Sequence, residues 1–262
     1  LSRAMVSLCP QRFAVKGVAH VRRLVQPELL RKMNWVMRSH AERVMQALGS
    51  RPIGIGSREG YHELVQRSPS RFDVPMSQCD LTPIWSEGQS PPWLDFVQEV
   101  LGPEAKESFA GVVFSKPGSP AQQWHIDSPH EAKEHLPAHA VNVLVALAEI
   151  PLAAGPTEVA SGTHTLTNHL ARPWLNRDDL LYQTATELVP QELDSIGSDA
   201  ELHSGTVEAM AAGDCLIFDD RILHRGLANK SSSDRWVAYF SYMRPRPGSV
   251  EDTHFEATRS LF

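Results

Sequence analysis

The chain has 262 residues, of which 42% are hydrophobic, with 25 Lys and Arg against 31 Asp and Glu. This composition excludes a disordered chain and supports a sizeable core, and we expect one domain spanning 1–262 rather than two small ones. The net charge of −6, without basic runs, argues against a general binder of nucleic acids or anionic membranes.

No segment predicts a membrane span or a disulfide framework. The longest unbroken apolar stretch, from Val143 to Ala148, falls far short of the roughly 18 residues that a spanning helix needs. Three scattered cysteines, Cys9, Cys79 and Cys215, favour a reducing compartment, so the expected location is intracellular, in the cytoplasm. Because the sequence starts without Met, a trimmed organelle-targeting segment stays open. Composition gives no indication of the oligomeric state.

The first half of the chain predicts helices. Apolar residues recur at helical spacing from Pro27 to Leu48, with the proline suited to the first turn and Gly49 to the end. A second, shorter amphipathic helix is expected from Pro91 to Leu101, where Gly102 and the proline after it stop it.

After residue 108 the pattern changes to short apolar runs separated by turn residues, which predicts strands. The runs are Phe109 to Ser115, Val141 to Ile150, Asp214 to Phe218 and Arg235 to Met243. Strands without long helices between them favour an antiparallel sandwich or barrel. We therefore expect a mainly β protein with flanking helices: a helical N-terminal flank at 1–108, a β core at 109–245, and a polar insertion at 168–205 with a short helix near Arg177 to Leu181.

His125 and Asp127 are the first candidate metal ligands. If their segment is extended, the two side chains point to the same face. A His-x-Asp pair alone is weak evidence, since a surface histidine beside a solvated aspartate has the same pattern. A third ligand is available, because the apolar strand that begins after Gly213 leads through a turn to His224. Two histidines and one carboxylate on one face of a metal are the arrangement of non-haem Fe(II) oxygenases.

Arg235 extends this hypothesis. It heads an apolar run whose period-two alternation places Arg235, Val237 and Tyr239 on one face. A guanidinium binds a carboxylate with two parallel hydrogen bonds, so a dicarboxylate co-substrate that chelates iron at one end could reach Arg235 at the other. The alternative is a salt-bridged or snorkelling residue at a strand edge.

These features together resemble the phytanoyl-CoA dioxygenase family of Fe(II)- and 2-oxoglutarate-dependent oxygenases. The resemblance covers roughly residues 109 to 245 in order and spacing. It rests on four elements: His125-Ile-Asp127; Gly155-Pro-Thr-Glu-Val159 with Ser161-Gly-Thr-His164; Gly213-Asp214 leading through Phe218-Asp219 to His224-Arg-Gly226; and Arg235. It implies a double-stranded β-helix core, also called a jelly roll and similar to that of cupins.

The resemblance also implies roles for individual residues. His125, Asp127 and His224 would bind Fe(II), and Arg235 would hold the distal carboxylate of 2-oxoglutarate. No catalytic residue beyond the metal ligands is implied.

Three further positions are implied to help bind the co-substrate: Gln123, Asn142 and Thr157. Hydrogen bonds at a strand edge or within a turn are the alternative for each. Some relatives carry a serine two residues after the distal histidine, and because this chain has Gly226 there, that contact must be absent or moved.

The implied activity uses Fe(II), 2-oxoglutarate and O2 to hydroxylate a small-molecule substrate, with release of succinate and CO2. Asp127 argues against the halogenase branch, in which a small residue replaces the carboxylate. The alternatives are desaturation, epimerisation or cyclisation at the same metal, a zinc-dependent cupin-like hydrolase or isomerase, and a non-catalytic binding module. The sequence does not identify the substrate, and basic residues such as Arg71 and Arg221 are expected to be solvated.

Overall fold

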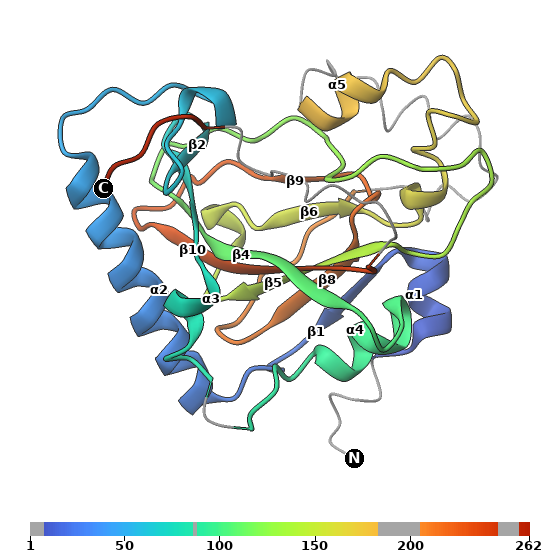
Figure 1. Cartoon of the computed structure of the whole chain (residues 1–262), viewed down its shortest axis with the longest axis horizontal. Helices are drawn as coiled ribbons and strands as arrows, with labels where there is room; N and C mark the ends of the chain where they lie inside the picture. Colours follow the sequence, from blue (N-terminus) through green and yellow to red (C-terminus); the bar gives the residue numbers. More distant parts are fainter. Residues whose placement is uncertain (1–7, 86–87, 183–204, 246–256) are drawn as a thin grey trace.

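The structure is a computed structural model that describes residues 8–85, 88–182, 205–245 and 257–262 (Figure 1). Its helices are α1 (Pro10–Lys16), α2 (Pro27–Leu48), α3 (Gln78–Leu81), α4 (Leu94–Leu101) and α5 (Arg177–Tyr182). Its strands are β1 (Val18–Val21), β2 (Val65–Ser68), β3 (Arg71–Pro75), β4 (Lys106–Ser115), β5 (Ala140–Ala146), β6 (Thr157–Ala160), β7 (Gly205–Thr206), β8 (Cys215–Asp219), β9 (His224–Gly226) and β10 (Arg235–Met243).

The strands form two antiparallel sheets. The larger sheet has seven strands in the order β1-β8-β5-β10-β4-β3-β2, and the smaller has three in the order β7-β6-β9. Strands that are neighbours in a sheet come from distant parts of the sequence, as when β10 lies between β4 and β5. The predicted mainly β, jelly-roll fold is confirmed.

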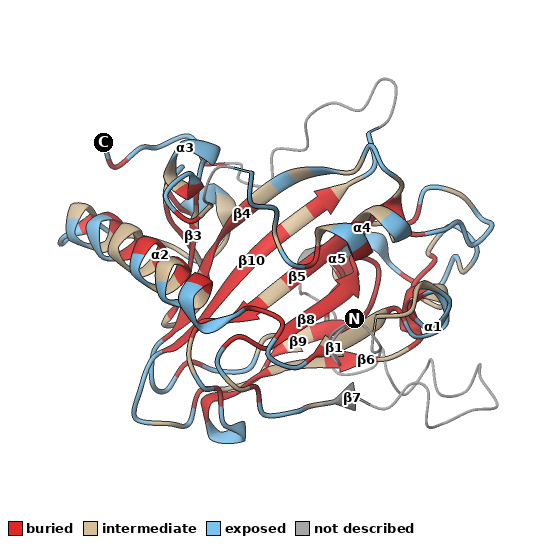
Figure 2. Ribbon diagram, turned by 90° about the horizontal axis from the view of Figure 1, so that it is seen from below, coloured by how far each residue is buried: buried red, intermediate tan, exposed pale blue. Residues whose placement is uncertain are grey.

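Strand β10 shows how the core is divided. Trp236, Ala238, Phe240 and Tyr242 point to the outer face of the large sheet, where they join a core shared with α2 and α4. Val237 points the other way, toward residues of the small sheet and its loops. The strands at the centre of the large sheet are buried, whereas α2 is exposed along its outer side (Figure 2). The predicted alternation along β10 therefore separates the helix-facing core from the space between the sheets.

Helix α2 has the predicted bounds because local sequence alone defines it. Pro27 lies in its first turn, and the backbone turns out of the helix at Gly49, where φ is +55°. Its apolar face packs on the large sheet through Leu29, Met33, Val36, Met37, Ala41, Val44 and Leu48. None of the helices in the described part of the chain has the length and apolar character that crossing a bilayer requires.

The region 1–108 is not wholly helical, which corrects the expectation of a helical flank. Strands β1, β2 and β3 belong to the large sheet. They are too short for a clear periodicity; β1 and β3 pair with distant strands, such as Phe218 for Val18 and Ser115 for Arg71, and β2 pairs with β3. Within the predicted insertion at 168–205, α5 matches the expected short helix, and residues 183–204 lie outside the described part.

Candidate metal centre

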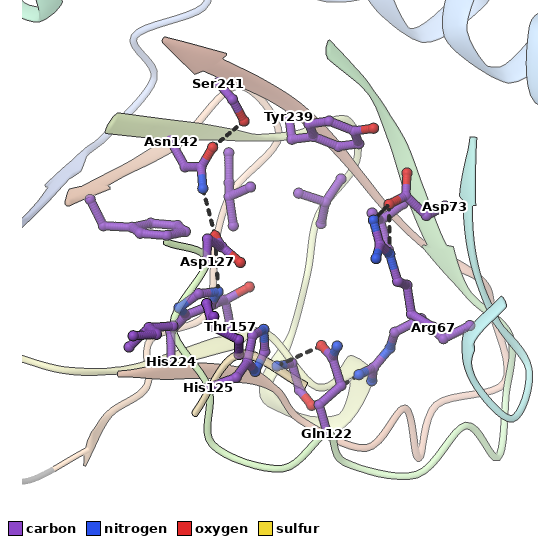
Figure 3. A pocket seen from close by; sticks show the side chains of 18 of the residues that line it. Arg67, Asp73, Gln122, His125, Asp127, Asn142, Thr157, His224, Tyr239 and Ser241 are labelled. Carbon is purple, nitrogen blue, oxygen red and sulfur yellow. Dashed lines mark hydrogen bonds and ion pairs between the residues drawn. The ribbon is translucent and has the colours of Figure 1, made fainter. Parts of the chain in front are cut away.

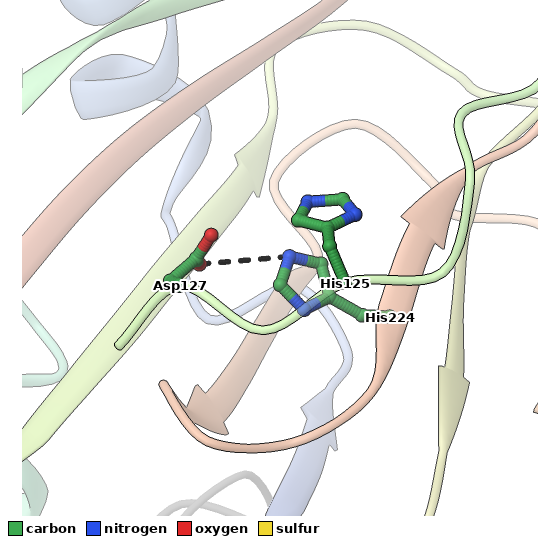
Figure 4. Close-up of side chains that lie close together, drawn as sticks. All are labelled: His125, Asp127 and His224. Carbon is green, nitrogen blue, oxygen red and sulfur yellow. Dashed lines mark ion pairs between the residues drawn. The ribbon is translucent and has the colours of Figure 1, made fainter. Parts of the chain in front are cut away.

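His125, Asp127 and His224 meet in the space between the two sheets (Figure 4). Asp127 and His125 lie in the irregular segment between β4 and β5, and His224 begins β9. The backbones of His125 and His224 exchange two hydrogen bonds of 3.1 and 3.0 Å, which sets the imidazoles side by side with ring centroids 4.3 Å apart. One ligand atom from each of the three residues lies within 4.8 Å of the others.

The backbone fixes which nitrogen each histidine presents to the centre. His125 Nδ1 lies 2.9 Å from the carbonyl oxygen of Gln123, and His224 Nδ1 lies 3.1 Å from that of Ile222. A carbonyl oxygen can only accept, so each Nδ1 carries a proton and donates the hydrogen bond, and Nε2 is the nitrogen that each ring offers to a metal. This is the tautomer that a metal-binding histidine needs.

The charges around the centre also favour a metal ion. Burial lowers the pKa of His125 to about 3, with a smaller contribution from His224, so this imidazole is neutral at physiological pH. Asp127 Oδ2 lies 3.5 Å from His224 Nε2 and accepts a hydrogen bond of 2.6 Å from Asn142 Nδ2. Ser241 in turn donates to Asn142 Oδ1. Asn142 therefore orients the Asp127 carboxylate, and it also lines the cavity, where a contact with the co-substrate stays a prediction.

This donor set fits a divalent metal. Two unprotonated imidazole nitrogens and a carboxylate on one side leave the opposite side open to the cavity, as the facial triad of non-haem iron enzymes requires. The same three donors also suit zinc. The choice between the metals therefore depends on what else lines the cavity.

The cavity measures about 350 Å³, and both the triad and Arg235 line it. Figure 3 shows the triad at this cavity with Thr157 and Gln122 beside it. Arg235 is 4% exposed, donates to the carbonyl oxygen of Gly155 and lies 3.2 Å from Ser115 Oγ, while its Nε has no hydrogen-bond partner in the described residues. Burial lowers the pKa of Arg235 to about 9, with a smaller contribution from Arg71. Arg235 is thus a buried cation without a carboxylate partner among the described residues, and a carboxylate ligand would compensate its charge.

Arg71 is a second buried guanidinium at this end, and the sequence analysis missed it. It is fully buried on β3, and its Nε donates to Ser115 Oγ at 2.9 Å, so Ser115 lies between the two arginines. Its other nitrogens donate to the carbonyl oxygens of Gly226, Pro120 and Leu227. Burial lowers its pKa to about 10. The expectation that Arg71 and Arg221 are solvated is wrong, because both are buried; Arg221 is paired with Asp219 at 2.7 Å.

Of the two remaining positions predicted to bind the co-substrate, Thr157 and Gln123, only one lines the cavity. Thr157 lines the cavity. Gln123 is exposed and does not line it; its contribution is the backbone carbonyl that holds His125. The neighbouring Gln122 lines the cavity instead, and its Oε1 accepts from the backbone N–H of Gly226 at 3.0 Å. A β-carbon at position 226 would lie 2.7 Å from that oxygen and 2.9 Å from Arg71 Nη1. The space of the missing serine is thus occupied by Gln122 and Arg71.

Two other motif residues have structural roles. Gly155 adopts φ +70°, and a β-carbon there would lie 2.3 Å from the carbonyl oxygen of Ala228. Only glycine fits this turn, which presents its own carbonyl to Arg235. His164 is buried away from the cavity lining, with Nε2 3.0 Å from the carbonyl oxygen of Ala14, against Gly17.

Comparison with known proteins gives a match to one family. The sequence profile of phytanoyl-CoA dioxygenase (PhyH) matches residues 13–237, which is most of the chain. No curated protein matches the sequence.

Several solved structures share the fold. The non-heme α-ketoglutarate-dependent carbocyclase SnoK from nogalamycin biosynthesis is 18% identical with a TM-score of 0.60, over 97% of this chain and 89% of that one. The epimerase SnoN, in a complex with Fe3+, α-ketoglutarate and nogalamycin RO, is 16% identical with a TM-score of 0.61, over 95% and 89%. HygX from Streptomyces hygroscopicus, with nickel and 2-oxoglutarate bound, is 13% identical with a TM-score of 0.56, over 99% and 96%.

Proposed function

The chain belongs to the phytanoyl-CoA dioxygenase family and is an Fe(II)- and 2-oxoglutarate-dependent oxygenase; within that activity, we propose that it hydroxylates a small molecule at a centre built by His125, Asp127 and His224. Arg235 binds the distal carboxylate of 2-oxoglutarate. The bound iron, 2-oxoglutarate and O2 together supply the oxidation of a C–H bond, with succinate and CO2 as by-products. The chain's own residues hold these groups and orient the substrate.

One observation carries this proposal: the same cavity is lined by three metal donors and by a buried guanidinium that has no carboxylate partner among the described residues. 2-Oxoglutarate complements both ends, because its keto-acid group chelates a metal while its second carboxylate reaches Arg235. Burying Arg235 without a carboxylate costs free energy, and the bound co-substrate offsets that cost. Thr157 borders the path between the ends and adds a hydroxyl group to it.

The same observation disfavours a zinc hydrolase or isomerase. Such an enzyme needs the three metal donors but has no use for a buried cation at the far end of the cavity. Desaturation, epimerisation and cyclisation use the same metal and co-substrate as hydroxylation. They differ in where the substrate's C–H bond lies, so product analysis distinguishes them.

The proposed setting is the cytoplasm, with a small-molecule substrate and neither nucleic acid nor membrane as a partner. The free thiols of Cys9, Cys79 and Cys215 support a reducing compartment. The net charge of −6 supports the absence of polyanionic partners.

The test is succinate release from 2-oxoglutarate with Fe(II) and ascorbate, in the wild type and in two variants. His125→Ala should abolish turnover by removing a metal ligand. Arg235→Ala should turn over only at much higher 2-oxoglutarate concentration. The exposed His62 provides a matched control, and His62→Ala should behave as the wild type. A wild type that consumes no 2-oxoglutarate would contradict the proposal and leave the zinc alternative.

A further inference from the structure

Three side chains on the cavity wall opposite the metal triad have no role in binding the metal or 2-oxoglutarate. We call Arg67, Asp73 and Tyr239 the polar wall. They come from β2, β3 and β10, and all three line the cavity. In Figure 3 they lie across the open space from Asp127 and His224. A substrate that enters this space therefore lies between the metal and the polar wall.

A glycine makes room for the tyrosine. Gly111 on β4 is the register partner of Tyr239, and a β-carbon at 111 would lie 2.6 Å from the phenol oxygen and 2.8 Å from Cζ. Without a side chain at this position, the Tyr239 ring lies across β4 toward Asp73 on the next strand. The polar wall is thus built across four adjacent strands, β10, β4, β3 and β2, and its shape depends on Gly111.

Two polar atoms of this wall make no hydrogen bond of normal geometry within the described part of the chain, although the two side chains lie close enough to interact: Asp73 Oδ1 and Tyr239 Oη. Both residues are more than nine-tenths buried, with exposures of 3% and 7%. Arg67 holds only the other carboxylate oxygen, with Nε and Nη2 at 2.9 and 2.7 Å from Asp73 Oδ2. Buried polar atoms without partners destabilise the free protein, and at a cavity wall they point to a ligand that completes them.

The charges of the wall nearly cancel. The guanidinium of Arg67 and the carboxylate of Asp73 form an ion pair of 2.7 Å. Burial first, and then the charge of Asp73, raise the pKa of Tyr239 well above its ordinary value, so the phenol keeps its proton and can donate. The wall therefore offers one acceptor and one donor with no net charge to satisfy.

Resting on the proposed oxygenase activity, we propose that Asp73 Oδ1 and Tyr239 Oη bind a hydroxyl group of a neutral, polyhydroxylated substrate and hold its target carbon against the metal. A hydroxyl group donates to Asp73 and accepts from Tyr239 at once. Arg67 is a positioning residue, because it fixes the carboxylate and leaves one oxygen facing the cavity.

Other substrate chemistries complete the wall less well. A carboxylate or phosphate cannot donate to Asp73 Oδ1 and is repelled by it. An ammonium group cannot accept from Tyr239. A hydrocarbon chain leaves both atoms without partners, and a site built to hydrogen-bond a hydroxyl group discriminates strongly against an analogue that lacks it. The polar wall therefore selects against a bare acyl chain.

The test uses protein loaded with Zn(II) and 2-oxoglutarate, which is diamagnetic and does not turn over. Three ligands with the same six-membered ring serve as probes: myo-inositol, cyclohexanecarboxylate and cyclohexylammonium. Their affinities are measured by saturation-transfer NMR. We expect the wild type to bind myo-inositol more tightly than the two charged probes.

Two variants connect this binding to the polar wall. Tyr239→Phe and Asp73→Asn should each weaken myo-inositol about tenfold, the effect of one hydrogen bond lost from a buried site. The matched control is Tyr242→Phe, because the Tyr242 hydroxyl faces away from the cavity, where it accepts from Trp93 Nε1 at 3.0 Å. That control should lower the stability to urea and leave probe affinity unchanged. Tyr239→Phe should weaken probe binding and leave the stability to urea unchanged, because its hydroxyl makes no hydrogen bond of normal geometry in the free protein.

The outcomes distinguish a failure of the proposed function from a failure of the inference about the polar wall. Titration of 2-oxoglutarate into each Zn(II)-loaded protein comes first, and its failure in the wild type would overturn the proposed function. If 2-oxoglutarate binds but myo-inositol does not, or if a charged probe binds more tightly, the inference about the polar wall is wrong while the proposed function stands. Undiminished myo-inositol binding by Tyr239→Phe would also overturn it.

Discussion

Two regions of the cavity wall differ in charge: two imidazoles and a carboxylate converge in one, whereas two guanidinium groups lie on either side of one serine in the other. The first region offers lone pairs and a negative charge. The second region has two cations, Arg71 and Arg235, but no ion pair with a carboxylate within the described part of the chain. A metal ion suits the first region and a carboxylate suits the second, so a metal ion with a bound dicarboxylate would complement both.

The two guanidinium groups themselves differ in how far the protein completes them. Arg71 donates to three backbone carbonyls and to Ser115. Arg235 reaches one carbonyl and the same serine, and its Nε has no partner in the described residues. The difference assigns Arg71 mainly to holding the loop around Gly226 and Arg235 mainly to binding the ligand.

The largest effect that tests this comparison is on 2-oxoglutarate binding. Arg235→Met should raise the Kd for 2-oxoglutarate by about a hundredfold, because the co-substrate carboxylate would be buried without its partner. The affinity for the metal alone should not change, since the triad lies at the other end. Calorimetric titration of each ligand measures both values.

Arg71→Met is the matched comparison. It should lower the free energy of unfolding by about 2–5 kcal/mol, since it removes the guanidinium that donates to the carbonyls of Pro120 and Leu227, whereas the carbonyl of Gly226 keeps the N–H of Gln122. The stability loss in Arg235→Met should be the smaller of the two. If Arg71→Met unfolds no more easily than Arg235→Met, the assignment of the two arginines is wrong.

The bounds of α2 and β10 could be predicted because their periodicity is local. Helix α2 and strand β10 begin and end at the expected residues. Strands β1, β2 and β3 were missed because each is only four or five residues long, too short for a clear alternation. Strands β1 and β3 pair with strands far along the chain, whereas β2 pairs with β3 directly after it. Local pattern therefore sufficed for the long elements α2 and β10.

The residues of the site also divide into those that local sequence motifs indicated and those that only the folded structure reveals. The three metal donors and Arg235 were found from motif spacing, and the structure brings the donors together at one end of the cavity. Gln122 was missed because the family resemblance implied Gln123, two residues before His125, whereas the side chain that lines the cavity is the neighbouring one. Nothing in the sequence around Arg71 signals burial, because its partners are backbone carbonyls on distant loops.

A smaller effect is expected from the residue that orients the metal ligand. Asn142→Ala removes the hydrogen bond of 2.6 Å to Asp127 Oδ2. Metal affinity should fall by about ten- to a hundredfold, as is usual when a partner of a metal ligand is lost. Any weaker binding of 2-oxoglutarate by this variant should result from the lost metal alone. At saturating Fe(II), the Kd for 2-oxoglutarate should therefore equal that of the wild type. A direct role of Asn142 in holding 2-oxoglutarate predicts instead that the Kd stays raised at saturating metal.

The last prediction concerns the pH dependence of stability at two further buried histidines, His130 and His139. Burial, followed by the charge of Arg221, lowers the pKa of His130 to about 3 and that of His139 to about 4. The folded protein keeps these imidazoles neutral while the unfolded chain takes up protons below about pH 6.5. Their contribution to stability is therefore complete above pH 6.5. It is lost as the pH falls toward 4, by about 1.4 kcal/mol per pH unit for each histidine.

His139→Gln should reduce the dependence of the unfolding free energy on pH by about 1.4 kcal/mol per pH unit below pH 6.5, the contribution of one histidine. Urea unfolding of the metal-free protein at pH 8, 6 and 5 measures this slope. The matched control is Ser128→Ala, because Ser128 Oγ lies 3.0 Å from His139 Nε2. Removing that contact should lower stability at every pH but leave the titrating imidazole buried, so the slope should persist. A slope unchanged by His139→Gln would mean that this imidazole takes up a proton as readily in the folded protein as in the unfolded chain. Burial would then keep His125 neutral, but it would not lower the pKa of His139.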